Sequence, residues 1–440
     1  MWKFRWMYGV KSLSILIMFL SFPIFPWGSH YLIMDRVLEH RTASYANEEV
    51  PVEELETFVA TEANGLKGVF DDYFIWLKNR GSERFISYEF KVDVARKSPL
   101  AEFLRASRLR PAHKFYSVRR LLPGETAKYN LVNSFLVYPY LEKREMDRYS
   151  FENVKARKVS IRSILTTFVD EPDWGMDHEL WNVAEYGYGK QPFGKPKGES
   201  SKAPFHMYFQ HENFFVSKFA PEMTNGSMLP DRVELFQRLS EFAGKTNHPF
   251  WKYRFAAWAA HYVQDIAQPY HSKAVPSAGY YYYLKYALAS KENKIKIKKD
   301  TTQIVANRHF IYEDFVAYGL YKSYSDKNPI FENLKSYLTG GDAFLTGADS
   351  VGKLLQEVGA KASNHAPDID STIVAIFGKT ITMDPNYDLE HDPHYEISAF
   401  IRDINPEKGN ELVKESGKDF QTAAQATRSL LKLLGAYGPR

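Results

Sequence analysis

One stretch of the chain, HYVQDIAQPYH, constrains the fold more than any other. His261 and Asp265 are four residues apart in it, so on a helix they share one face and can hold the same ion. Pro269 cannot continue a helix, so the chain turns there and His271 can approach from another direction. We therefore predict a helix over residues 251–268, followed by a turn that completes a metal-binding group.

A second pair of the same kind, His309 and Glu313, lies in RHFIYEDF on another predicted helix. A lone pair at this spacing is more often a surface contact or a core histidine than a set of ligands. The chain has no cysteine, however, so any metal must be held by His, Asp and Glu side chains. Imidazole nitrogens and carboxylate oxygens suit zinc, and two such pairs together favour a zinc site.

The rest of the chain is also predicted to be mainly helical, because few segments alternate between apolar and polar residues as strands do. Residues 187–204 are predicted to form a surface loop, and the basic run KENKIKIKKD to separate two helices as a solvated segment. The fold class that follows is all-α. Further helices are predicted at residues 30–40, from 51 toward 78, and at 232–243, 280–290, 304–318 and 419–434.

The N-terminus has the pattern of an export signal. Lys3, Arg5 and Lys11 precede an apolar run that is interrupted by Pro23 and is short for a membrane-spanning helix. We predict an export signal at residues 1–26, with an uncleaved N-terminal anchor as the alternative. Either reading places the remaining chain outside the cytoplasm, as a secreted, periplasmic or surface-anchored protein. Without its three basic residues the chain is close to neutral, so its net charge does not favour nucleic acid.

The motif HYVQDIAQPYH resembles the signature of the bacterial zinc-dependent phospholipase C family. That family shares its helical fold with the single-strand-specific zinc nucleases of fungi and plants, and both hold three zinc ions among helices. The resemblance implies a single zinc-dependent phosphodiesterase domain over residues 27–440. It also implies three zinc ions (Zn²⁺), whose ligands would be, in chain order, Trp27, His30, Asp173, His206, His261, Asp265, His271, His309 and Glu313.

The resemblance also implies roles for these residues. Trp27 would bind through its amino and carbonyl groups, and Asp265 would bridge two ions as one of two catalytic carboxylates. Asp173, the other, would orient the attacking water or accept its proton. The ion held by His271, His309 and Glu313 would stabilise the leaving oxygen.

The chain departs from the family pattern at three places. Pro26 precedes Trp27 and makes a poor cleavage site, so it stays open whether cleavage frees the Trp27 amine. About a hundred residues, near positions 45–160, are inserted after the first helix. The choice of ligand also has competitors. Asp170, Asp177 and His178 compete with Asp173, and His211 competes with His206.

The residues around the motifs favour one substrate class over another. Glu313 resembles the phospholipase branch, whereas the nuclease branch usually has Asp there. Tyr280 to Tyr283 and the lysines after them suit a lipid headgroup or a nucleic acid, although packing and solvation are the simpler readings. We predict phospholipase C action on phospholipid headgroups, with a phospholipid or membrane surface as partner. The alternatives are a single-strand-specific nuclease acting on single-stranded nucleic acid, and a degenerate zinc-binding surface protein that is not an enzyme. No protein partner is predicted.

Overall fold

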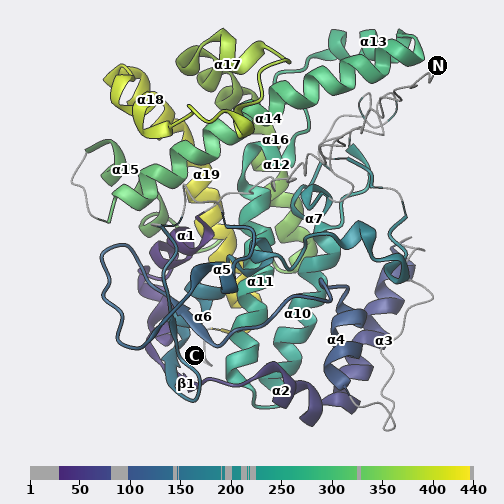
Figure 1. Ribbon diagram of the computed structural model, residues 1–440, viewed down its shortest axis with the longest axis vertical. Coiled ribbons are helices and arrows are strands. Elements are labelled where there is room, and N and C mark those ends of the chain that lie inside the picture. The colour runs from purple at the N-terminus through teal and green to yellow at the C-terminus, as the bar shows by residue number, and fades with distance from the viewer. Residues whose placement is uncertain are drawn as a thin grey trace, which may run out of the picture.

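The computed structural model of the chain (Figure 1) is 66% helical and 4% strand, which confirms the all-α class. Trp27, the predicted export signal at residues 1–26 and His211 lie outside the residues that it describes. None of the described helices is both long and apolar enough to cross a membrane. The described residues are 29–80, 98–141, 146, 148–189, 191–193, 201–209, 216, 218, 224–324 and 329–436.

Helix α11 (Pro249–Ala267) forms the centre of the molecule (Figure 1). It begins with a proline in its first turn and ends just before Pro269, as the sequence predicts. Every residue from Tyr253 to Ala267 is buried, so this helix is surrounded by protein on all sides. Such burial allows the polar side chains of α11 only where other polar groups meet them.

The helices around α11 come from distant parts of the chain. Those in contact with it include α6 (Ile161–Phe168), α10 (Leu229–Lys245), α16 (Val351–Phe377) and α19 (Pro406–Leu433). The short helices α1 (His30–Val37), α7 (Ala203–His206) and α12 (Pro269–Ser272) bring further side chains to the same core. The core is therefore assembled from long-range contacts around one buried helix.

The segment between α1 and α6 leaves and returns to the helices at one place. There β1 (Glu49–Pro51) pairs antiparallel with β5 (Lys158–Ser160), so the two ends of the segment lie side by side. The helix predicted from residue 51 toward 78 is wrong as a single element, because it divides at Glu62 into two helices. Between β1 and β5 lie α2 (Leu55–Thr61), α3 (Ala63–Asn79), α4 (Pro99–Ser107), α5 (Ser134–Val137) and a three-stranded sheet in the order β2 (Val118–Arg120), β4 (Phe151–Asn153), β3 (Leu131–Val132).

A helical hairpin lies at one edge of the molecule, at the upper right of Figure 1. It consists of α13 (Tyr280–Leu288) and the start of α14 (Lys291–Lys322). The basic run at residues 291–300 is helical, so its prediction as a separating segment is wrong. Lysine is a good helix former, and Ser290 caps the helix by accepting the backbone N–H of Asn293. The chain then continues through α15 (Pro329–Thr339), α17 (Lys379–Met383) and α18 (Ile397–Asp403).

Candidate metal centre

Three groups of buried side chains could each hold a metal ion, because the ligand atoms within each group lie within 4.8 Å of one another. They are built around α11, α12 and α14, and two of them share His261. We name them site A (Asp173, His206 and His261), site B (His271, His309 and Glu313) and site C (His30, His261 and Asp265). The structure thus brings together every predicted ligand that it describes.

Site A combines one helix with two short irregular segments. His261 comes from α11, His206 from α7, and Asp173 from a 3-10 turn at residues 171–174. The distance from His261 Nε2 to His206 Nδ1 is 3.0 Å, and the distance from His261 Nε2 to Asp173 Oδ1 is 3.9 Å. The three side chains therefore converge on one small volume.

The hydrogen bonds behind site A fix which ring nitrogens face inward. His261 Nδ1 donates to the carbonyl of Val169 at 2.8 Å, so the Nε2 atom of its neutral ring presents a lone pair. His206 Nε2 faces the Asp177 carboxylate at 3.3 Å, which leaves its Nδ1 for a metal. Carboxylates and carbonyls commonly orient metal-binding histidines in this way.

Site B is built on two helical segments, with His271 on α12 and His309 and Glu313 on α14. The two Nε2 atoms of His271 and His309 lie 3.0 Å apart. Glu313 Oε1 is 2.7 Å from His309 Nε2 and 3.3 Å from His271 Nε2. Gln268 holds the same carboxylate oxygen with its amide at 3.1 Å. Three ligand atoms thus form one compact triangle.

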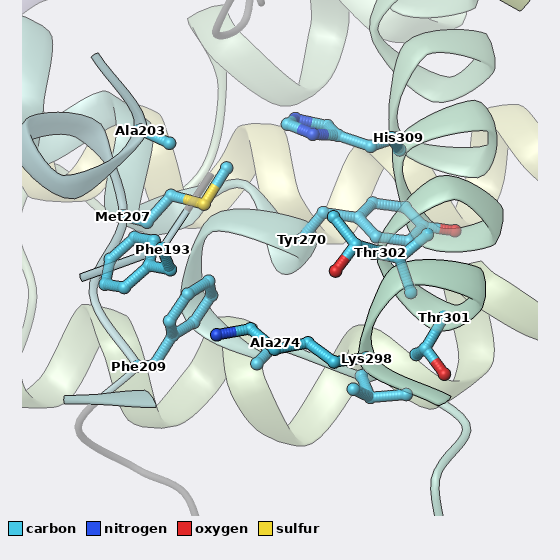
Figure 2. A pocket seen from close by; sticks show the side chains of 13 residues that line it. Phe193, Ala203, Met207, Phe209, Tyr270, Ala274, Lys298, Thr301, Thr302 and His309 are labelled. Atoms are coloured by element: carbon cyan, nitrogen blue, oxygen red, sulfur yellow. The ribbon is translucent and has the colours of Figure 1, made fainter. Parts of the chain in front are cut away.

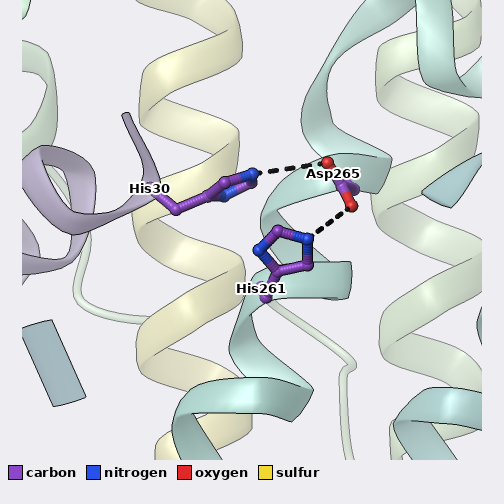
Figure 3. A group of neighbouring side chains, drawn as sticks. All are labelled: His30, His261 and Asp265. Atoms are coloured by element: carbon purple, nitrogen blue, oxygen red, sulfur yellow. Dashed lines mark ion pairs between the residues drawn. The ribbon is translucent and has the colours of Figure 1, made fainter. Parts of the chain in front are cut away.

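A chain of hydrogen bonds orients His30 in site C. Thr427 on α19 donates to the carbonyl of Ala423, so its oxygen accepts from the Gln264 amide at 3.2 Å. The Gln264 carbonyl oxygen then faces His30 and accepts from its Nδ1 at 2.9 Å. The other ring nitrogen of His30 points at Asp265 Oδ1, 3.4 Å away (Figure 3).

Asp265 lies between the three groups and uses its two oxygens on opposite sides. Oδ2 faces His206 Nδ1 at 2.8 Å and His261 Nε2 at 3.3 Å. Oδ1 faces His30 Nε2 at 3.4 Å and His271 Nδ1 at 3.2 Å. Figure 3 shows the carboxylate between His30 and His261, with one oxygen toward each ring. This is the placement expected of a bridging carboxylate.

The donor set and its spacing fit zinc. A tetrahedral zinc ion with ligands at about 2 Å has ligand–ligand edges of about 3.3 Å. In site B the three distances between ligand atoms are 2.7, 3.0 and 3.3 Å. In site C, the lone pair of His261 faces the Asp265 carboxylate oxygen at 3.3 Å, a repulsive contact that a cation between the two atoms would relieve.

The site's charges are strongly coupled. Burial raises the pKa of Asp265, but His261, His271 and His206 hold it well below its usual range. Burial lowers the pKa of His271, whereas Asp265 and Glu313 raise it to about 9. Burial raises the pKa of Glu313, whereas His309 and His271 lower it to about 2. The carboxylates of Asp265 and Glu313 are therefore ionised at neutral pH, as a metal site requires, whereas burial raises the pKa of Asp173.

The structure separates Asp173 from its three competitors. Asp170 accepts the backbone N–H of Tyr31 and an Arg120 guanidinium, so it supports the segment before site A. Asp177 holds His206 from behind and itself pairs with a buried arginine. The ring of His178 stacks on a tyrosine, with its centroid 4.1 Å from that of Tyr140.

Lys202 is a member of the site that the sequence does not reveal. Its ammonium donates to Asp173 Oδ1 at 2.7 Å, and both side chains are buried. Lys202 precedes α7 and lies four residues before His206. Lysine is not a ligand type at neutral pH, and no spacing rule connects it to a carboxylate 29 residues earlier. The pair is visible only once the fold is known.

An apolar pocket opens beside site B (Figure 2). His309 lies at one end, and the side chain of Lys298 crosses the other end with its nitrogen toward Phe209. The rings of Phe193 and Phe209, with centroids 5.2 Å apart, form one wall together with Met207. The pocket thus connects a candidate metal ligand to a mainly apolar binding surface.

Comparison with known proteins assigns no family to this chain. A scan against protein-family models finds no match, and searches of curated proteins and of solved structures find no significant match either. The resemblance to the phospholipase C family therefore depends on the sequence motif, and the interpretation of the site depends on its geometry.

Proposed function

We propose that the protein is a zinc-dependent phosphodiester hydrolase with the helical fold of the phospholipase C and zinc nuclease superfamily. The observation that carries this proposal is the position of Asp265 between sites A, B and C, with different histidines facing each of its oxygens. One isolated His and carboxylate pair would serve a structural ion equally well. Three groups joined by one carboxylate suit a reaction in which several oxygens of a phosphate must be held at once.

The protein's own residues have separable roles in this reaction. Zinc ions bound here would neutralise charge on the phosphate and lower the pKa of water toward about 7. Asp265 would hold the ions at a fixed separation. Asp173, oriented by Lys202, would orient the attacking water and accept its proton. His271, His309 and Glu313 would hold an ion on the side of the phosphate from which the alcohol leaves.

The substrate class that we propose is a phospholipid, cleaved on the side of its apolar portion. The pocket beside His309 is lined mainly by apolar side chains and suits the start of a diacylglycerol group. Glu313 in site B resembles the phospholipase branch. The tilted rings of Phe193 and Phe209 favour the second candidate, a single-strand-specific nuclease, because such rings can also stack on bases.

A paired assay tests the reaction and the substrate together. Zinc-loaded protein is incubated with phosphatidylcholine dispersions and with single-stranded DNA, each with a chelated control. We expect chelator-sensitive release of phosphorylated headgroup and no DNA cleavage. DNA cleavage alone would make the protein a nuclease. Cleavage of neither substrate would contradict both the phospholipase and the nuclease proposal.

A matched pair of histidine variants separates the site from general effects. His309→Gln removes a site B ligand, whereas His394→Gln changes an exposed histidine outside all three groups. We expect His309→Gln to lose activity by at least about a hundredfold and His394→Gln to keep it. Equal activity in the two variants would contradict a catalytic role for site B.

A further inference from the structure

The α13–α14 hairpin, residues 280–300, presents an unusual surface. Among the described residues, several of the large hydrophobic side chains that are exposed lie in this short segment. Tyr281 is 77% exposed, Leu288 is 79% exposed and Ile295 is 64% exposed. Figure 1 shows α13 at the edge of the molecule, while α14 runs from there back into the helical core. A soluble surface rarely gathers such residues without a partner.

Helix α13 has two different apolar faces. Tyr283 and Tyr286 are buried and pack with Ile297 of α14, so they hold the hairpin together. Tyr281, Leu284 and Leu288 follow the spacing of one helical face on the other side, and all three are exposed. The exposed face is therefore not needed to stabilise the hairpin. The predicted packing of the tyrosines is correct for Tyr282 and Tyr283, whereas Tyr280 and Tyr281 are exposed.

The first turns of α14 surround an exposed aliphatic residue with lysines. Ile295 lies between Lys291, four residues before it, and Lys298 and Lys299, three and four residues after it. Residues at these spacings are neighbours on one helix surface. The hairpin has six lysines and only two acidic residues, and one of the acids, Asp300, pairs with Lys296. Its net charge, six lysines minus two acidic residues, equals the formal net charge of +4 of the whole chain.

We propose that this hairpin docks on a membrane surface that contains anionic lipid. Exposed aromatic and aliphatic side chains can enter the boundary between headgroups and acyl chains, while flanking lysines attract anionic headgroups. Nucleic acid would use the same lysines, but Leu284, Leu288 and Ile295 have no planar face on which a base could stack. The combination of aliphatic and basic side chains therefore favours lipid.

The hairpin is directly connected to the pocket of the candidate metal centre. Lys298, Thr302, Val305 and His309 lie at helical spacing along α14, and all of them line the pocket. At about 1.5 Å per residue, Ile295 lies roughly 20 Å along the helix from His309. Docking through Ile295 would thus turn the pocket toward the bilayer. This adds a partner to the proposed function, but the docking itself does not require hydrolysis.

Sedimentation with lipid vesicles tests the proposal. Protein in a chelating buffer, where the proposed reaction cannot run, is mixed with vesicles of phosphatidylcholine alone or with 30% phosphatidylserine. We expect at least about tenfold tighter binding to the anionic vesicles, weakened by salt. Equal and weak binding to both vesicles would overturn the proposal.

Two double variants with matched controls locate the binding surface. Lys291→Glu with Lys299→Glu should weaken binding by at least about 25-fold, at roughly fivefold per lysine. The control is Lys353→Glu with Lys361→Glu, two exposed lysines on α16. Equal loss in both charge variants would show that only total charge matters and would contradict a docking site on the hairpin.

The apolar contribution needs its own variants. Tyr281→Ser with Leu288→Ser should weaken binding by about tenfold or more, because the apolar area that enters the boundary region is lost. The control is Ile75→Ser with Leu136→Ser, residues that are 58% and 59% exposed elsewhere. Unchanged binding in the hairpin variant would contradict insertion.

Other partners would appear as distinct results. Tighter binding of the hairpin to single-stranded DNA than to anionic vesicles would overturn the lipid assignment, as would a dimer whose contacts are lost with Leu288→Ser. Vesicle binding without hydrolysis of any phosphodiester would support docking while removing the proposed function. Hydrolysis without vesicle binding would do the reverse.

Discussion

Sites A and B hold similar donor atoms in different surroundings. In site A, the ligands depend on buried charges. Lys202 pairs with Asp173, and Arg232 pairs with Asp177 behind His206. In site B, Glu313 accepts a hydrogen bond from the neutral amide of Gln268 in addition to facing its two histidines. Two metal-binding groups of one centre are thus supported by different means.

The two sites also differ in the local structure that sets the positions of their ligands. Two ligands of site B, His309 and Glu313, lie four residues apart on α14, so the helix itself sets their separation. Asp173 and His206 of site A lie on short irregular segments, whose direction depends on tertiary contacts. One such contact comes from the segment between α1 and α6, where Arg120 donates to Asp170. We infer that site B is fixed mainly by helix geometry and site A by buried ion pairs.

The largest effect should come from the carboxylate that the sites share. Asp265→Asn keeps the shape of the side chain but removes its charge from between His206, His261, His30 and His271. We expect lower zinc content in sites A and C and activity reduced on the order of a thousandfold. Zinc content by mass spectrometry, together with hydrolysis of a chromogenic phosphodiester, measures both. Normal zinc content in this variant would remove the bridging role.

Replacing Lys202 tests whether site A depends on a buried cation. Lys202→Met leaves Asp173 buried without the Lys202 ammonium, which should lower the stability of the metal-free protein by about 3 kcal/mol or more. Zinc would then replace the lost charge, so the stability difference should shrink when zinc is added. Denaturant unfolding with and without zinc measures the change.

The matched change in site B is Gln268→Met, which removes a neutral hydrogen bond to Glu313. We expect a smaller loss of stability there, on the order of 1–3 kcal/mol. If the two variants lost equal stability and responded equally to zinc, the distinction between the sites would be wrong.

The orientation of His206 gives an intermediate effect that is confined to site A. Asp177→Asn weakens the acceptor behind His206 while keeping a similar shape. We expect zinc affinity of site A to fall about 10- to 100-fold, and that of site B to stay unchanged. Stepwise zinc titration against a chelator of known affinity resolves the two. A parallel loss at both sites would point to a general loss of structure.

The smallest expected effect is a pH dependence of the zinc affinity of site B. Because the pKa of His271 is raised to about 9 in the metal-free protein, its Nε2 must lose a proton when zinc binds below that pH. The pKa of Glu313, lowered to about 2, means that the carboxylate releases none near neutrality. Affinity at site B should therefore rise by up to about tenfold per pH unit from 7 to 9. Calorimetry in buffers of different ionisation enthalpy counts the proton, and zinc binding without proton release would contradict this account.

The sequence predicts the parts of the centre that helix geometry determines. His261 with Asp265, and His309 with Glu313, are recognisable because residues four apart share a helix face. The choice among Asp170, Asp173 and Asp177 is not determined in this way. These residues lie in turns, and arginines from distant segments bind two of them and leave the third for the site.

The errors in the predicted elements have similar causes. The basic run after α13 is helical because helix propensity and the Ser290 cap outweigh the repulsion between its lysines. The pairing of β1 with β5 joins residues more than a hundred positions apart and has no local signature. The link between Lys202 and Asp173 likewise depends on contacts between distant segments.

An anomalous diffraction map, collected at the zinc edge from zinc-loaded crystals, tests the proposed zinc centre most directly. We expect peaks in site A between Asp173, His206 and His261, and in site B between His271, His309 and Glu313, with a third peak where His30 faces Asp265. Zinc bound only elsewhere, for example at His365 and Glu415, or no bound zinc in an otherwise folded protein, would contradict a zinc centre around Asp265.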